Sequence, residues 1–116
     1  MSLQPIIDHR ETVDQALIVE IAEKIVKAFD PKRIVLFGSH ARGDARPDSD
    51  LDLMIEMESE LNFYARIAKV STIFGLRKWP MDLLVYTPAE IHEQSEINGT
   101  MVNLIEREGK VLYARK

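Results

Sequence analysis

The sequence contains no cysteine and a single tryptophan. Without cysteine the chain can form neither disulfides nor thiolate metal sites, and this composition fits a reducing compartment. No apolar run approaches the ~20 residues that a membrane-spanning helix needs, and the first ten residues include polar and charged side chains. We therefore expect a cytoplasmic protein that has no signal peptide and makes no membrane contact.

Basic residues are also scarce relative to acidic ones. The chain has 15 lysines and arginines against 19 aspartates and glutamates, which gives a formal net charge of −4. Affinity for nucleic-acid backbones depends on clustered lysine and arginine side chains that release counterions. The charge balance argues against a nucleic acid as the main partner and leaves room for a small anion bound through metal ions.

Length and composition indicate one globular domain, which we assign to residues 1–116. With 46% hydrophobic and 29% charged residues the composition is ordinary for such a domain, and the length supports a single core. Residues 1–12 contain Pro5 and show no clear periodicity. We expect them to form a loose lead-in to the domain.

The rest of the chain shows alternating helical and strand patterns. Apolar residues at three- and four-residue spacing predict helices, namely 14–30, 61–76, one that starts at Thr87-Pro88 and a last one that ends before Gly109. Short apolar or alternating runs predict strands over 34–37, 51–56, 81–86 and 111–113, with a helical turn through Arg42. This order predicts an α+β fold, in which a small mixed β-sheet has its helices packed on one side.

A Gly-Ser pair, Gly38-Ser39, directly follows the first predicted strand. A glycine at this point lets the backbone approach a ligand closely, and the amides that follow can point at a phosphate. Arg42 lies three residues further on, where it could clamp a phosphate or pair with Asp44 or Asp48 instead. A plain turn capped by Ser39 is an alternative that the pair alone leaves open.

Asp50 and Asp52 lie two residues apart at the start of the second predicted strand. This spacing places them on one face with α-carbons ~6.6 Å apart. Two negative charges at that separation repel by ~2.5 kcal/mol at an effective dielectric of ~20, so a cation between them would be favourable. Magnesium suits such a carboxylate pair, although two solvated acids on an exposed strand would have the same sequence.

Asp82 is the only charged residue in the apolar run 81–85. An acid in a buried strand needs a partner or a metal ion, because an unpaired buried charge is costly. A salt bridge to Arg77 or Lys78 is one explanation. The other is that Asp82 faces the aspartate pair from a neighbouring strand.

These residues together resemble a known family. Gly38-Ser39, followed after ten residues by Asp50-Leu51-Asp52, resembles the signature of the polymerase-beta nucleotidyltransferase superfamily. The Gly-Ser-x-Ala-Arg-Gly-Asp form at 38–44 resembles its small stand-alone members, the minimal nucleotidyltransferases (MNT). The resemblance implies the polymerase-beta-like nucleotidyltransferase fold.

The resemblance also implies a role for each candidate site residue. Asp50 and Asp52 would bind two divalent ions, Mg²⁺ or in its place Mn²⁺, and Gly38 and Ser39 would hold the triphosphate of ATP. Asp82 matches the third carboxylate of the family, which binds one metal ion and helps to deprotonate the attacking hydroxyl. The candidate catalytic and metal-binding residues are therefore Asp50, Asp52 and Asp82, and the candidate nucleotide-binding residues are Gly38, Ser39 and Arg42.

Small members of this family are commonly paired with a HEPN-domain toxin that they neutralise by transferring AMP to a tyrosine. The resemblance therefore implies an antitoxin that adenylylates a partner toxin. Two alternatives stay open, which are nucleotidyl transfer to a small molecule such as an aminoglycoside, and neutralisation by binding alone, which an Asp82 salt bridge would favour. The acceptor can belong to a partner or be one of the chain's own tyrosines, and both a homo-oligomer and a hetero-oligomer are compatible with the sequence. The role of residues 95–116 also stays open. In that segment Ile97, Met101 and Tyr113 are candidates for partner contacts or for core packing.

Overall fold

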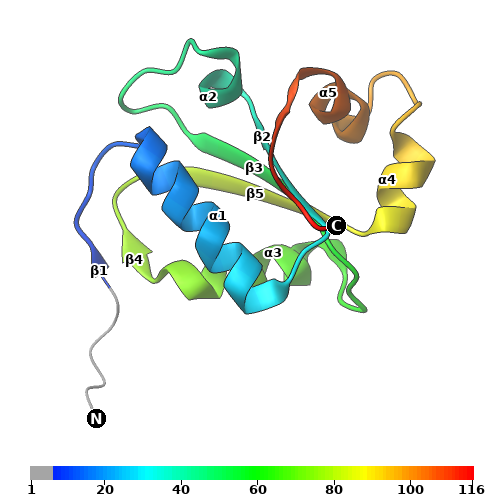
Figure 1. Ribbon diagram of the computed structural model, residues 1–116, viewed down its shortest axis with the longest axis horizontal. Coiled ribbons are helices and arrows are strands. Elements are labelled where there is room, and N and C mark those ends of the chain that lie inside the picture. The colour runs from blue at the N-terminus through cyan, green and yellow to red at the C-terminus, as the bar shows by residue number, and fades with distance from the viewer. Residues whose placement is uncertain (1–6) are drawn as a thin grey trace.

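The computed structural model describes residues 7–116, which are built around a four-stranded sheet with the order β5-β3-β2-β6 (Figure 1). The strands are β2 (Arg33–Phe37), β3 (Leu51–Glu56), β5 (Met81–Tyr86) and β6 (Lys110–Ala114). β3 and β5 are parallel, whereas β2 is antiparallel to both β3 and β6. The α+β class and the mixed sheet are thus confirmed.

Helices begin and end close to the expected positions. They are α1 (Gln15–Phe29), α2 (Ser39–Arg42), α3 (Phe63–Ser71, followed by a 3-10 turn over Thr72–Phe74), α4 (Pro88–Gln94) and α5 (Met101–Glu108). The carboxylate of Asp14 accepts the Leu17 amide at 2.8 Å and so caps α1. None of the helices within residues 7–116 combines the length and the apolar character needed to cross a membrane.

The sheet differs from the sequence expectation in carrying helices on both of its faces. The larger core cluster joins α1 and α3 to one face, and a second cluster joins Val35 and Met54 of the opposite face to α4 and α5. Figure 1 shows α1 and α3 together on one side of the strands and α4 and α5 together on the other. Strands that are apolar at successive positions need cover on both faces, which is why a one-sided arrangement does not suffice here.

The lead-in also differs from expectation. β1 (Ile7–Asp8) pairs in parallel with β4 (Leu76–Arg77), and the Asp8 carboxylate accepts hydrogen bonds from Trp79 Nε1 at 3.0 Å and from the Arg10 guanidinium. The Arg10 guanidinium holds the pKa of Asp8 below its usual range. A two-residue strand has no detectable periodicity in the sequence, and residues 1–6 lie outside the described residues.

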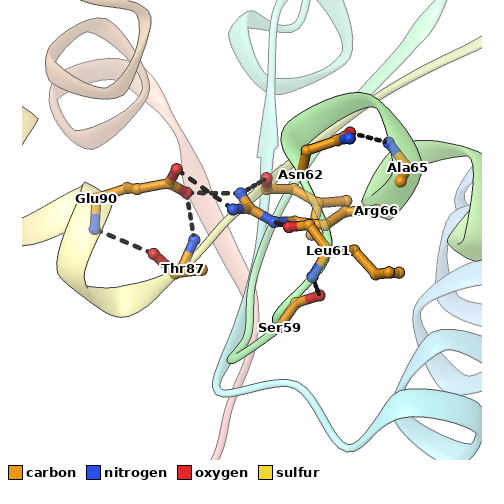
Figure 2. A network of polar contacts seen from close by, with 8 residues as sticks. Ser59, Leu61, Asn62, Ala65, Arg66, Thr87 and Glu90 are labelled. Carbon is orange, nitrogen blue, oxygen red and sulfur yellow. Dashed lines mark hydrogen bonds and ion pairs between the residues drawn. The ribbon is translucent and has the colours of Figure 1, made fainter.

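A buried arginine joins α3 to the carboxyl end of β5 (Figure 2). Arg66 donates hydrogen bonds to the carbonyl oxygens of Leu61 and Val85, at 2.8 and 3.2 Å, and to the carboxylate of Glu90 at 2.7 Å. Glu90 also accepts the Thr87 amide at 2.8 Å, while the Thr87 hydroxyl accepts the Glu90 amide, so that both bonds of a capping box are present. This network fixes the end of the sheet opposite to the candidate site.

Candidate active site

The candidate residues are brought together at one end of the sheet by strand direction. β2 ends at Phe37, whereas β3 and β5 begin at Leu51 and Met81. Because β2 is antiparallel to β3 and β3 is parallel to β5, these three strand ends lie at the same edge. Residues that flank them come together although they are far apart in sequence.

Asp52 and Asp82 are register partners on adjacent parallel strands. Neighbouring strands lie about 4.8 Å apart, and register partners project to the same face. Asp50 lies two residues before Asp52, immediately outside β3, and so belongs to the same face. The structure therefore brings the backbone positions of all three aspartates to one corner of the sheet, as the sequence interpretation required.

The charge state of Asp52 reflects this crowding. Burial, and then the negative charges of Asp82 and Asp50, raise the pKa of Asp52 to about 6, against the opposing influence of His40 and Arg42. Near neutral pH the three carboxylates therefore repel one another. A cation at this corner would relieve the repulsion.

The surroundings of Asp82 differ from the buried position that its apolar neighbours suggested. Asp82 is exposed, because β5 is an edge strand and only alternate residues such as Leu83 contribute to the core. Within residues 7–116 no basic side chain forms an ion pair with Asp82, since Lys78 pairs with Glu11 at 3.4 Å and the Arg77 guanidinium lies 5.0 Å from the centre of the Trp79 ring. The salt-bridge explanation for Asp82 is therefore wrong.

Position 38 requires a glycine, both because of its backbone conformation and because the Asp52 carboxylate lies against it. Its φ is +73°, and a Cβ added to it would lie 3.0 Å from Cγ of Asp52 and closer still to Oδ2. The Gly38 carbonyl accepts the amides of Ala41 and Arg42 at 3.1 Å, which starts α2. Ser39 is the first helical residue and not a side-chain cap, so its hydroxyl is not engaged in capping.

Arg42 makes the ion pair that was one of its two expected roles. Its Nε lies 3.3 Å from Oδ2 of Asp44, with the two side chains 51% and 63% exposed. An ion pair with this much exposure contributes little to stability. Asp48 is exposed in the loop. Arg42 is thus held weakly and can exchange its partner for a phosphate.

His40 was not singled out by sequence reasoning, because the three histidines share no ligand spacing. The structure places its Nε2 at 3.3 Å from the carbonyl oxygen of Ser49, the residue before Asp50. The signal in the sequence was its position inside the Gly-Ser motif. It therefore belongs to the surroundings of the site.

The donors at this corner suit a hard divalent cation. Among residues 7–116 no three acidic or histidine side chains are already gathered closely enough to hold an ion. Asp50 and Asp82 are exposed and can turn, and the absence of a Cβ at Gly38 lets the Asp52 carboxylate lie directly against the turn. Carboxylate oxygens are the ligands that Mg²⁺ and Mn²⁺ prefer, so the residues present fit these ions, and their convergence on an ion stays a prediction.

Comparison with known proteins identifies the family of the chain. Residues 18–112, from α1 to β6, match the family described as Nucleotidyltransferase domain. The match covers most of the chain, and the chain belongs to this family. The resemblance to nucleotidyltransferases that the Gly-Ser and aspartate motifs suggested is thereby confirmed.

Two curated relatives are similar over much of their length. MJ0604 of Methanocaldococcus jannaschii, named a candidate protein adenylyltransferase, is 29% identical over 82 residues, which cover 71% of this chain and 78% of that protein. The protein adenylyltransferase MntA of Thermococcus cleftensis is 29% identical over 66 residues, which cover 54% of this chain and 67% of the relative. The chain is therefore similar to proteins named for adenylyl transfer to protein.

Two solved structures share the fold. A candidate nucleotidyltransferase from Sulfolobus solfataricus superposes with a TM-score of 0.62 at 23% identity, covering 86% of this chain and 79% of its own. A toxin-antitoxin structure with AMP-PNP superposes with a TM-score of 0.53 at 19% identity, covering 84% and 74%. At these identities the similarity supports the nucleotidyltransferase fold and nothing finer.

Proposed function

We propose that this chain is a metal-dependent nucleotidyltransferase that transfers AMP from ATP to a hydroxyl of a partner toxin and thereby acts as an antitoxin. The family gives the reaction class. Two relatives named for protein adenylyl transfer, and a toxin-antitoxin complex with the same fold, support the finer statement.

The observation that carries the proposal is the pairing of Asp52 with Asp82 beside the Gly38 turn. A residual site that had lost catalysis would need no third carboxylate aligned with the other two. Asp82 is exposed and forms no ion pair within residues 7–116. Its charge is therefore available for a metal ion and for an attacking hydroxyl.

Each residue then has a specific task. Asp50, Asp52 and Asp82 would hold two Mg²⁺ ions, for which Mn²⁺ can substitute; when bound, such ions stabilise the entering and departing oxygens of a displacement at phosphorus. The backbone after Gly38 and the Ser39 hydroxyl would donate hydrogen bonds to the triphosphate, and Arg42 would neutralise part of its charge.

The chemistry itself is a displacement at the α-phosphorus. Asp82 would accept the proton of the acceptor hydroxyl while the oxygen of that hydroxyl forms a bond to the α-phosphorus. The bond from that phosphorus to the bridging oxygen breaks, and pyrophosphate leaves. The protein thus contributes mainly positioning and electrostatic stabilisation, as is usual for phosphoryl and nucleotidyl transfer.

We assign the acceptor to a tyrosine of a HEPN-domain partner toxin, on the resemblance described above. Ile97 and Met101, near the start of α5, are 50% and 45% exposed and offer apolar surface to such a partner. Tyr113 packs partly against the core instead. Tyr64, at 80% exposure, is the most accessible tyrosine for modification of the chain itself among residues 7–116.

The test is to incubate the purified chain with the product of the adjacent gene, Mg²⁺ and each of the four nucleoside triphosphates. Intact-mass measurement should detect the gain of one AMP on the partner, with ATP only. Chelation of Mg²⁺ and the Asp50→Asn variant should abolish the gain, while circular dichroism shows that this variant keeps its fold. Tyr64→Phe separates self-modification from transfer to the partner.

If neither protein gains mass while the partner is still inhibited, transfer to protein is excluded and neutralisation by binding alone takes its place. Unfolding of Asp50→Asn would show that the carboxylate is structural and that the site has been misread.

A further inference from the structure

His40 connects the phosphate turn to the loop that precedes the aspartates. Its Nε2 lies 3.3 Å from the carbonyl oxygen of Ser49, and the ring is half-buried. Since Ser49 directly precedes Asp50, the contact joins α2 to the first residue of the acidic corner. No other side-chain hydrogen bond within residues 7–116 joins α2 to this loop end.

Ser49 is well suited to transmit such a constraint. Its hydroxyl accepts the Arg46 amide at 2.7 Å, and its own amide donates to the Arg46 carbonyl at 3.0 Å. Ser49 thus closes a compact turn at the end of a loop whose other residues are mostly exposed. Asp50 is held on its C-terminal side by the buried Leu51, whose amide donates to the Pro80 carbonyl at 3.0 Å. On its N-terminal side the exposed part of the loop has few contacts, so there the location of Asp50 depends on how Ser49 is held.

We propose that His40 is a positioning residue, whose ring N–H donates to the Ser49 carbonyl and so holds Asp50 at a fixed distance from the Gly38-Ser39 turn. This inference rests on the proposed function, because the distance matters only if one side holds triphosphate and the other holds metal. The bond requires the proton on Nε2, which leaves Nδ1 as an acceptor in the neutral ring. Direct contact of His40 with the nucleotide is the competing role.

The first test is the tautomer of the ring in the intact protein. Long-range proton–nitrogen NMR spectra recorded at about pH 8.5, above the ordinary range of histidine, should show His40 with its proton on Nε2. The exposed His9 and His92 serve as internal references. A neutral His40 that carries its proton on Nδ1 would refute the bond.

The second test is the affinity for Mn²⁺ alone, measured by electron paramagnetic resonance of the free ion. His40→Ala should weaken binding about tenfold, as loss of an orienting residue behind a metal ligand commonly does. His40→Gln should stay within about twofold of the original chain, because its amide nitrogen lies as many bonds from Cα as Nε2 does and can donate the same hydrogen bond. His92→Ala, an exposed histidine on α4, is the matched control and should change nothing.

These measurements separate the positioning role from its competitors and from the proposed function. Unchanged Mn²⁺ affinity in His40→Ala refutes positioning and leaves direct contact with the nucleotide as the role of His40. Failure of His40→Gln to restore the affinity also refutes positioning, because it shows that the ring itself binds Mn²⁺. Neither test needs an acceptor, so a chain that responds as expected but transfers no nucleotide would refute the proposed function alone. Absence of Mn²⁺ binding in the unaltered chain would refute both.

Discussion

The substitution Gly38→Ala isolates the contact between the phosphate turn and the acidic corner. The new Cβ would lie 3.0 Å from Cγ of Asp52 and nearer to Oδ2, whereas carbon atoms in good contact lie about 3.5–4.0 Å apart. The Asp52 carboxylate must therefore move by roughly 1 Å. Misplacement of a catalytic group by that amount can reduce a rate by about a hundredfold, and we expect a loss of this size in AMP transfer.

A cost in stability accompanies the lost activity. The φ of +73° at Gly38 is nearly restricted to glycine, and such strain costs about 1–3 kcal/mol. For 116 residues, an unfolding entropy of about 2.1 cal/mol/K per residue makes 1 kcal/mol equal to about 4 °C in Tm. Gly38→Ala should thus lower Tm by roughly 4–12 °C.

Gly99→Ala is the matched control, because Gly99 has a φ of +92° but no atom within 4 Å of an added Cβ. It should lower Tm by a similar amount and leave the transfer rate unchanged. Initial rates by intact mass and Tm by circular dichroism measure the two effects separately. A Gly38→Ala protein that transfers AMP as fast as Gly99→Ala would refute the reasoning.

Three further predictions concern charges. Asp52→Asn and Asp82→Asn should each abolish transfer without lowering Tm, because neither removes a stabilising partner. The raised pKa of Asp52 means that the folded state holds this proton more tightly than the unfolded chain does. The stability that the bound proton contributes is therefore lost as pH rises from about 4 to about 6. Mn²⁺ affinity should fall as pH drops below about 6, because the ion binds the deprotonated carboxylate. Arg66→Ala should destabilise the fold by about 3 kcal/mol, because it removes the ion pair of Glu90 and the hydrogen-bond donor to two carbonyl groups.

Each of these predictions has its own control. Denaturant titrations from pH 3 to pH 8 should show that the pH effect disappears in Asp52→Asn, and persistence of the effect would assign it to another group. Full activity of Asp82→Asn would show that Asp82 is not a catalytic residue. Arg115→Ala, which breaks an exposed pair with Asp30, should cost less than about 1 kcal/mol, and a loss as large as that of Arg66→Ala would contradict the argument from burial.

Much of the fold could be predicted from local patterns. Leu51–Glu56 and Met81–Tyr86 form the strands that alternation and apolar content predicted, and α4 begins at Thr87-Pro88 as predicted. These features depend on neighbours in sequence. The β1–β4 pair and the packing of α4 and α5 on the second face of the sheet depend on residues far apart in the chain. A single sequence carries no periodic signal for such contacts.

The candidate site also has features that local patterns predicted and features that depend on the folded chain. The motif identified Gly38, Asp50 and Asp52, and the register of β3 and β5 then aligned Asp82 with them. What the sequence could not give was the exposure of Asp82, since an apolar run does not reveal whether its strand lies at an edge. His40 was missed because its contact is with a backbone carbonyl, which has no residue-type signature.

The parallel register of β3 and β5 has a consequence for how the chain can change in length. Leu83 and Val85 are buried in the larger core, and a slip of β5 by one residue would turn both of them out of it. The hydrophobic core thus sets the alignment of Asp82 with Asp52, and the connecting residues 57–80 do not. Insertions or deletions in the exposed turn before α3 should therefore be tolerated without displacing the carboxylate, so relatives can differ in length there and keep the same chemistry.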